Sequence, residues 1–567
     1  MRITAIEIEN FKGISERVRV DLKPITLLFG ANSAGKSTVL HALLYMKDVL
    51  ERRNLDAIAT PVSGRALDLG GFRNFAHGQD LNRTVRIALS MDLTGGELPA
   101  MAPTYELPSI LSTAAEDRVK QFYRAQSDIL DSIKSVKVAI EVRWDEESRK
   151  PVAFAYTVSL NGSDLIRIER ESEKLKVAKF DWCNPAVSRP YTNEERSLYR
   201  GLVDLETGEE SSPEPLEEGR VALLYEVLPR FVAHKSNLAG LRNWLPARQD
   251  PIPEFSIKEN LNLAEADSDW ERRTGDYERF DLDCSEVAKM WAWEGTEFLA
   301  RLIVGPGKLV QDWLQGLRYT GPLRARPPRK GMPSEELSDW SEGVAAWKAL
   351  EDEDNSTDLI EQVSQWLAGK DRLNSGYELA RTHLAHVDAD AFRNAVDGDL
   401  DRKQLLDLLK EALKSTEIKL IEMRSGLRLD PSDVGVGISQ VLPIVVGAVL
   451  PGGSVVAVEQ PELHIHPAMQ VALGDLFIDG VAKRGMSFLI ETHSEHLILR
   501  LLRRVRETNE GTLPPGLPEV RPEDIGVLYV DKDAGGMRIS SLPIDGSGEF
   551  TERWPRGFFV ERGEELF

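Results

Sequence analysis

Cysteine is scarce in this chain of 567 residues, which contains only Cys183 and Cys284. The two lie far apart in the sequence, and no further cysteine or histidine clusters around either of them. This pattern argues against a disulfide framework and against a structural zinc site. Two reduced thiols in a reducing compartment are expected.

Long apolar runs are also missing, since no uninterrupted stretch approaches the length needed to cross a bilayer. The first residues, Met1–Glu7, carry a charge every few positions and do not resemble a signal peptide. We therefore expect a cytoplasmic protein without a membrane partner.

Positive charge is in deficit, because 70 Lys and Arg stand against 92 Asp and Glu, for a net charge of -22. Any contact with nucleic acid therefore requires a local basic patch rather than the overall field of the protein. Internal repeats and a sustained heptad are absent as well, which excludes a repeat array and a long coiled coil. A chain of this length exceeds what one hydrophobic core serves, so about two or three domains are expected.

The segment Gly30–Ser37 matches the phosphate-binding pattern G-x-x-x-x-G-K-[ST] at every position. An apolar run, Ile25–Phe29, precedes it as a strand, and Thr38–Tyr45 follows it as a helix. Backbone N–H groups and the helix N-terminus can hold phosphate oxygens, while Lys36 reaches the β- and γ-phosphates and the Ser37 hydroxyl ligands Mg²⁺. The predicted ATP-binding residues are Gly30, Ala31, Asn32, Ser33, Ala34, Gly35, Lys36, Ser37 and Thr38.

A second apolar run, Ser454–Val458, predicts a buried parallel strand that ends in Glu459. An acidic residue at such a strand end, in a chain with a phosphate loop, can hold Mg²⁺, so Glu459 is predicted as a metal ligand beside Ser37. The run Phe488–Ser494 predicts another buried strand, which ends at His493.

The opening of the chain resembles the head of ABC-type ATPases related to SMC and RecF proteins, with two short strands and the turn Asn10–Gly13 before the phosphate loop. More specific motifs resemble the OLD-like ATPases of bacterial anti-phage defence, and among them the PtuA-type ATPase of Septu and of PtuA-carrying retrons. These motifs are Glu459–Pro467, Glu491–His496, the G-x-G-x-S-Q-x-L-P segment at 435–443, the turn Gly321–Arg324 and the ending Trp554–Phe559.

The resemblance implies an α/β fold, namely an ABC-type (RecF/SMC-like) P-loop NTPase head with a large, compact, mostly helical insertion. Helix is predicted over 285–316 and 334–414, and a hairpin around Asn161 and Gly162. The predicted domains are the first half of the head at 1–95, the insertion at 96–415, the second half at 416–510 and a small C-terminal domain at 511–567.

The resemblance also assigns roles to single residues. His493 is expected to contact the γ-phosphate. Gln79, with His77 as its rival, is expected to reach the metal and the attacking water. The glycine-rich segment, with Gly435, Gly437 and Ser439, is expected to reach the γ-phosphate of a partner chain, so that a homodimer or a higher even oligomer encloses its ATP molecules.

One departure from this family pattern concerns the residue after Glu459. Many such ATPases have a catalytic glutamate there, whereas this chain has Gln460. An amide can orient a water molecule but cannot take its proton. Either Glu462 serves as the base, or hydrolysis is slow and ATP acts as a long-lived clamp; we hypothesise slow turnover.

A basic turn at 318–330 interrupts the insertion with Arg318, Arg324, Arg326, Arg329 and Lys330. Such a turn can contact the phosphates of nucleic acid or of the bound nucleotide, or a partner protein. A solvated loop is the alternative.

No nuclease domain is expected in this chain. Asp531 and Asp533 form an Asp-x-Asp pattern of the kind that two-metal nucleases use, but they read as turn residues of a hairpin with Gly535 and Gly536. The resemblance places the destructive activity on a partner, an HNH nuclease, joined in retrons by a reverse transcriptase and its nucleic acid. Two alternatives stay open: a RecF-like ATPase that maintains or repairs DNA ends, and a scaffold that binds ATP without turnover.

Overall fold

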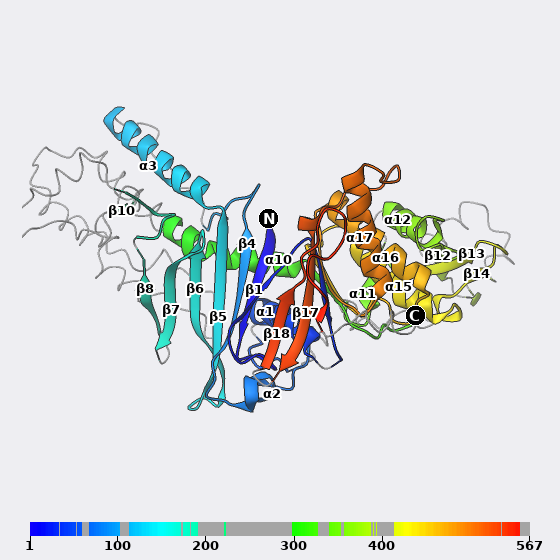
Figure 1. Ribbon diagram of the computed structural model, residues 1–567, viewed down its shortest axis with the longest axis horizontal. Coiled ribbons are helices and arrows are strands. Elements are labelled where there is room, and N and C mark those ends of the chain that lie inside the picture. Colours follow the sequence, from blue (N-terminus) through cyan, green and yellow to red (C-terminus); the bar gives the residue numbers. More distant parts are fainter. Residues whose placement is uncertain are drawn as a thin grey trace, which may run out of the picture. The chain divides into compact units, whose positions relative to one another are not determined.

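The computed structural model describes residues 1–32, 34–52, 54–58, 67–101, 113–171, 174–181, 183–190, 220–222, 297–326, 340–352, 357–386, 389–390, 393, 413–533 and 536–555. The chain divides into two compact units (Figure 1). The first contains Met1–Asp21, Ala42–Ile58 and Leu69–Gln315, and the second contains Leu22–His41, Ala59–Asp68 and Gly316–Phe567. The segment predicted as the first half of the head, 1–95, therefore contributes to both units.

The first unit is built on a seven-stranded antiparallel sheet with the strand order β2-β1-β4-β5-β6-β7-β8. Its strands are β1 (Arg2–Glu9), β2 (Val18–Asp21), β4 (Val85–Asp92), β5 (Ser135–Asp145), β6 (Lys150–Leu160), β7 (Ser163–Glu171) and β8 (Lys174–Phe180). The predicted hairpin is confirmed, since Asn161 and Gly162 connect β6 to β7 with positive φ angles of 47° and 86°.

The two faces of this sheet differ because side chains alternate along each strand. One face is apolar, with Val138, Ile140 and Tyr156 buried. It carries α10 (Gly305–Gln315), which crosses the strands in Figure 1 and contacts β5. The Tyr156 hydroxyl donates to the backbone oxygen of Ile303 at 2.8 Å, which fixes the segment before α10 on the sheet.

Short elements complete the first unit. They are η1 (Asp48–Arg52), α2 (Phe72–Phe75), η2 (His77–Gln79), α3 (Thr113–Ser132), β9 (Ser188–Pro190) and β10 (Arg220–Ala222). The rings of Phe11, Tyr45 and Phe75 form a buried aromatic cluster, with centroids 4.8 to 5.8 Å apart.

The second unit contains a six-stranded sheet in the order β11-β15-β16-β3-β17-β18. Its strands are β3 (Ile25–Gly30), β11 (Leu317–Thr320), β15 (Val455–Glu459), β16 (Ser487–Glu491), β17 (Ile525–Asp533) and β18 (Gly536–Ser541). All are parallel except β18, which forms an antiparallel hairpin with β17. The central strands β3, β15 and β16 are buried along their whole length, as expected for a parallel sheet covered on both faces.

Helices and a smaller sheet surround this parallel sheet. They are α1 (Lys36–Lys47), α11 (Val344–Glu351), α12 (Thr357–Ala368), η5 (Pro431–Asp433), α15 (Val436–Val449), α16 (Pro467–Arg484), α17 (Glu495–Glu510) and η6 (Pro522–Asp524), with β12 (Tyr377–His386), β13 (Leu413–Glu422) and β14 (Arg428–Leu429). The boundary between the units falls within α1. Among the described helices, none combines the length and the apolar character that a membrane crossing requires.

The predicted α/β fold is confirmed, but the insertion differs from the prediction. Helix was expected throughout 334–414, whereas residues 377–386 form β12 and pair with β13 over ten positions. A long ladder of backbone hydrogen bonds outweighs the weak helical preference of this segment. The described part of 96–415 contains β5 to β12 as well as α3, α10, α11 and α12, so a mostly helical insertion is not confirmed.

Candidate nucleotide-binding site

The phosphate loop lies between β3 and α1, at the carboxyl edge of the parallel sheet. Two of its glycines are dictated by close contacts. Gly30 has φ 144°, and a Cβ atom there would lie 2.1 Å from the backbone oxygen of Val530 on β17. Gly35 has φ 102°, and its Cβ would lie 2.6 Å from Sδ of Met537 on β18. The β17–β18 hairpin therefore sets the shape of the loop.

Lys36 is folded over this loop. Its side chain is buried, and Nζ donates to the backbone oxygens of Gly30 at 3.1 Å and Ala31 at 3.0 Å. Burial lowers its pKa, and the nearby charges of Glu491, Glu462 and Glu459 oppose this shift. Ser33 lies outside the described residues.

Glu491 is a site residue that the sequence reasoning did not assign. The Ser37 hydroxyl donates to Oε2 of Glu491 at 2.6 Å, and Nζ of Lys36 lies 3.8 Å from Oε1. The strand order explains this arrangement: β16, which ends in Glu491, lies directly beside β3, whereas β15 lies one strand further away. An acidic residue at the end of the predicted strand before His493 was the signal that could have found it.

Glu459, the predicted metal ligand, is paired in register with Glu491 across β15 and β16. Its Oε1 accepts a hydrogen bond of 2.9 Å from the Tyr319 hydroxyl and lies 3.6 Å from Nε2 of His41. Burial and the Glu459 carboxylate raise the pKa of Tyr319, which therefore stays protonated and donates.

These groups fit a magnesium nucleotide. In the part of the chain that the structure describes, no group of three or more His, Cys, Asp or Glu side chains forms a metal site. Mg²⁺ in nucleotide sites is held by one or two carboxylates, a hydroxyl and the phosphates themselves. The Ser37 hydroxyl and the Glu491 carboxylate supply that donor set.

Glu462, which follows β15, is hydrogen-bonded to the segment that follows β16. Its Oε1 accepts from the backbone N–H of His493 at 2.7 Å, and its Oε2 accepts from the Thr492 hydroxyl at 2.8 Å. Burial raises the pKa of Glu462, although the His493 backbone bond partly offsets this. Both carboxylate oxygens thus hold the segment that follows β16, which fixes His493 beside the phosphate loop strand.

His493 and Gln460 lie in constrained backbone. Ser494 caps α17 by accepting from the N–H of Leu497 at 3.1 Å, so His493 sits between a strand end and a helix start. Burial, and then the Lys36 charge, lower the pKa of His493, which leaves its imidazole neutral at pH 7. Gln460 has φ 44°, unusual for a residue with a side chain, and its N–H donates to the backbone oxygen of Glu491 at 2.7 Å.

The predicted trans segment forms the start of α15, which begins at Val436 directly after Gly435. Gly435 is exposed at the N-cap and Gly437 lies partly exposed behind it. Ser439 is completely buried, so its hydroxyl does not lie on the surface that a second chain would meet. The predicted contact of this segment with the γ-phosphate of a partner chain stays a prediction. It now depends on Gly435 and Gly437, which are at least partly exposed.

The basic turn at 318–330 was predicted to offer its arginines for contacts, but two of them are buried. Arg318 and Arg324 are only 6% and 4% exposed. Arg318 donates to the backbone oxygens of Gly447 at 2.7 Å and Leu450 at 2.6 Å, and so binds the carbonyls at the end of α15.

Burial removes Arg318 and Arg324 from any surface that could meet nucleic acid. Arg326 is partly exposed, while Arg329 and Lys330 lie outside the described residues. Arg324 follows β11 and lies at the end of β15, where its Nη2 donates to the backbone oxygen of Glu459 at 2.7 Å.

The other predicted metal residues belong to the first unit. Gln79 ends η2 with φ 57°, and His77 at its start has Nδ1 2.9 Å from the backbone oxygen of Lys12. The phosphate loop belongs to the second unit, so the proposed contact of Gln79 with a metal stays a prediction.

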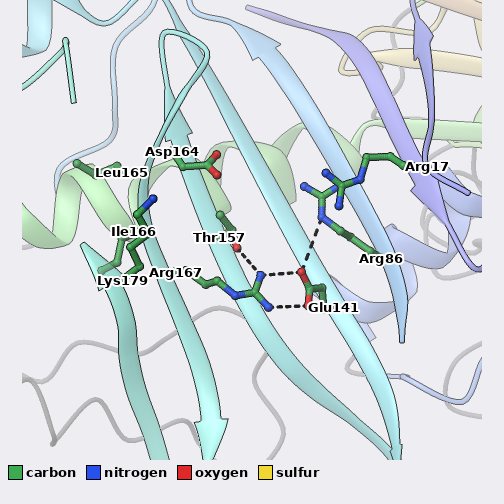
Figure 2. A pocket seen from close by; sticks show the side chains of 9 residues that line it. All are labelled: Arg17, Arg86, Glu141, Thr157, Asp164, Leu165, Ile166, Arg167 and Lys179. Atoms are coloured by element: carbon green, nitrogen blue, oxygen red, sulfur yellow. Dashed lines mark hydrogen bonds and ion pairs between the residues drawn. The ribbon is translucent and has the colours of Figure 1, made fainter. Parts of the chain in front are cut away.

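A polar pocket on the sheet of the first unit is a different kind of feature (Figure 2). It is lined by the basic residues Arg17, Arg86, Arg167 and Lys179 and by the acidic residues Glu141 and Asp164, and ion pairs hold part of these charges. Arg167 forms a two-pronged ion pair with Glu141 at 2.7 and 2.8 Å, and Arg86 donates to Glu7 at 3.0 Å. Figure 2 shows Arg86 and Arg167 reaching Glu141 from opposite sides. These pairs stabilise the polar face of the sheet.

Two family models match separate parts of the chain. A model described as "AAA ATPase domain" matches residues 1–141, and one described as "AAA domain, putative AbiEii toxin, Type IV TA system" matches residues 336–500. The first match includes the phosphate loop, and the second includes Glu459, Glu462, Glu491 and His493. The chain therefore contains ATPase domains of the AAA type, and nucleotide binding follows from them.

Among solved structures, the chain is similar to SMC head domains. The SMC head bound to the C-winged helix domain of ScpA is 10% identical, with 96% of this chain and 98% of that chain covered and a TM-score of 0.35. The Smc head domain with an extended coiled coil from Pyrococcus furiosus is 12% identical, with 100% and 98% covered and a TM-score of 0.35. The SMC head domain from Thermotoga maritima is 9% identical, with 96% and 100% covered and a TM-score of 0.34. No curated protein sequence matches the chain.

Proposed function

We propose that this chain binds ATP with Mg²⁺, hydrolyses it slowly, and through its ATP-bound homodimer controls a separate nuclease in bacterial anti-phage defence. The observation that carries the ATPase part is the convergence of Lys36, Ser37 and Glu491 at one edge of the parallel sheet, with the Ser37 hydroxyl 2.6 Å from the Glu491 carboxylate. Lys36 and the loop N–H groups would hold the phosphates, and Ser37 and Glu491 would hold the metal. The bound metal supplies charge compensation for the phosphates.

Slow turnover is supported by the two candidates for activating water. Gln460 cannot take a proton, because its side chain is an amide. Glu462 is a carboxylate, but both of its oxygens accept hydrogen bonds from Thr492 and His493. Positioning and electrostatic stabilisation then supply most of the catalysis, as is common in phosphoryl transfer.

The defence role is supported by the OLD-like and PtuA-type motifs and by the family description that matches residues 336–500, which names a toxin of a toxin–antitoxin system. The resemblance favours an HNH nuclease as the partner, with a reverse transcriptase and its nucleic acid in a retron setting. The glycine-rich start of α15, with Gly435 exposed, is the surface that we assign to the second copy of the chain.

The first test is to purify the full chain from its native host with the neighbouring genes intact, and to identify by mass spectrometry the protein and nucleic acid that accompany it. A nuclease that co-purifies and whose activity responds to ATP supports the proposal. A bare dimer that gains affinity for DNA ends when given ATP contradicts it and favours the RecF-like alternative.

The second test measures ATP binding and phosphate release by the purified chain. Lys36→Ala is the matched loss-of-binding control. Binding without release identifies the scaffold alternative.

A further inference from the structure

Arg324 lies at the edge of the sheet where the site is built. It ends the turn Gly321–Arg324, which follows β11, and β11 pairs in parallel with β15 up to Thr320 and Val458. Because both strands end at the same edge, the turn arrives beside Glu459. Nη2 of Arg324 donates to the Glu459 backbone oxygen at 2.7 Å, which fixes the guanidinium there.

The Arg324 guanidinium is almost fully buried and only partly satisfied. The residue is 4% exposed, and neither Nε nor Nη1 has a hydrogen-bond partner in the structure. A buried guanidinium normally uses its donors, since unpaired N–H groups away from water are costly. Nε and Nη1 of this cation therefore lack an acceptor from the chain itself, which leaves the guanidinium with unmet hydrogen-bonding capacity.

The backbone of Arg324 is held in place by Gln440 from α15. Oε1 of Gln440 accepts from the N–H of Arg324 at 3.2 Å, and Nε2 donates to its backbone oxygen at 2.7 Å. Gln440 is itself buried. This two-point clamp fixes where the side chain starts, so the guanidinium is positioned before any ligand binds.

The charges around Arg324 are those of the nucleotide site. Burial lowers its pKa to about 10, and the charges of Glu462 and Glu459 oppose this shift, so the group stays a cation at neutral pH. The same two carboxylates also act on Lys36, the cation of the phosphate loop. Arg324 and Lys36 therefore both lie within electrostatic reach of Glu462 and Glu459.

Arg318 is a nearby buried arginine whose guanidinium is paired, unlike Nε and Nη1 of Arg324. It lies six positions earlier and is equally buried, but its Nη1 and Nη2 donate to carbonyls of Gly447, Leu450 and Pro451. One buried arginine of this segment thus supports a helix end, whereas the other retains unfilled donors.

We propose that Arg324 binds the terminal phosphate of ATP within the same chain, through Nε and Nη1. This inference rests on the proposed ATP-binding function. The guanidinium presents a planar fork that matches the oxygens of a phosphate. Since ADP lacks the terminal phosphate, Arg324 distinguishes ATP from ADP in the binding step, and Gln440 keeps it aligned.

The experiment measures the affinities of the full-length protein for ADP and for a non-hydrolysable ATP analogue, both with Mg²⁺, by competition against a fluorescent nucleotide. Arg324→Ala is expected to weaken the ATP analogue about ten- to hundredfold, the range for hydrogen bonds to charged groups, and to change ADP by less than about twofold. Arg324→Lys is expected to retain part of the preference, because it keeps the charge and loses the fork.

Arg318→Met is the matched control. It removes an equally buried arginine from the same segment and is expected to leave the ratio of the two affinities unchanged. Equal weakening of both nucleotides in Arg324→Ala, or no change in either, overturns the inference. If the unaltered protein binds neither nucleotide, while its circular dichroism shows a folded chain, the proposed ATP-binding function fails first and the inference with it.

Discussion

Glu462 provides the sharpest test of how the site works, because a single substitution can separate a proton acceptor from a positioning residue. Its two oxygens accept from the His493 N–H at 2.7 Å and from the Thr492 hydroxyl at 2.8 Å. A glutamine at this position can keep both contacts. Its oxygen accepts from His493, and its amide donates to a lone pair of the Thr492 oxygen. An alanine removes both contacts.

The expected magnitudes follow from these bonds. A hydrogen bond to a charged acceptor contributes about 1.5–3 kcal/mol, and each 1.36 kcal/mol changes a rate about tenfold. If Glu462 acts by holding His493 in place, Glu462→Ala lowers kcat roughly ten- to hundredfold. Glu462→Gln stays within about threefold of the unaltered protein, because the contacts of His493 and Thr492 persist.

The assay is steady-state phosphate release, run beside ATP-analogue binding and thermal unfolding. Glu510→Gln, an exposed carboxylate at the end of α17, is the control and should change none of the three. Loss of turnover in Glu462→Gln with unchanged ATP affinity and unfolding temperature would refute the positioning role and identify Glu462 as the base.

Three further outcomes are expected. Glu491→Gln weakens the binding of ATP with Mg²⁺ while metal-free ATP binding changes little, because the carboxylate proposed to hold the metal beside Ser37 loses its charge. Titration with and without EDTA measures this, and an equal loss in both conditions contradicts it. Arg318→Met lowers the free energy of unfolding of the second unit by about 2–4 kcal/mol, because backbone carbonyls at the end of α15 lose a charged donor. Denaturant unfolding followed by tryptophan fluorescence measures this, and an unchanged free energy of unfolding contradicts it. His493 has a pKa below its ordinary 6.5, so the unfolded chain takes up this proton first as the pH falls. The stability linked to His493 is thus present above about pH 6.5 and declines toward the lower folded pKa, and His493→Gln should flatten that part of the pH–stability curve.

The sequence predicted the parts of the site that follow from local pattern. The phosphate loop, the strand that leads to Glu459 and the strand that leads to His493 each form a continuous apolar run with polar residues at its end, and each is a strand of the parallel sheet. Such runs can be read from one segment, because a strand buried on both faces needs no information about its partner.

The prediction was incomplete where the outcome depends on which strands are neighbours. Glu491 joins Ser37 because β16, and not β15, lies beside β3, and no local pattern contains that order. The five basic residues of 318–330 suggested an exposed patch, since charge favours the surface. Arg318 is buried instead because the carbonyls at the end of α15 offer hydrogen bonds that compensate its desolvation.

The strand order also determines at what point of translation the nucleotide site can form. β3 is central in the parallel sheet, and its neighbours β16 and β17 are translated more than four hundred residues later. The backbone of Val530 and the side chain of Met537 define the loop around Gly30 and Gly35. A nascent chain that has exposed its phosphate loop but not this hairpin has no formed pocket for nucleotide. ATP binding thus becomes possible only when β17 and β18 have left the ribosome, which delays any ATP-dependent pairing of two copies until both have exposed this hairpin.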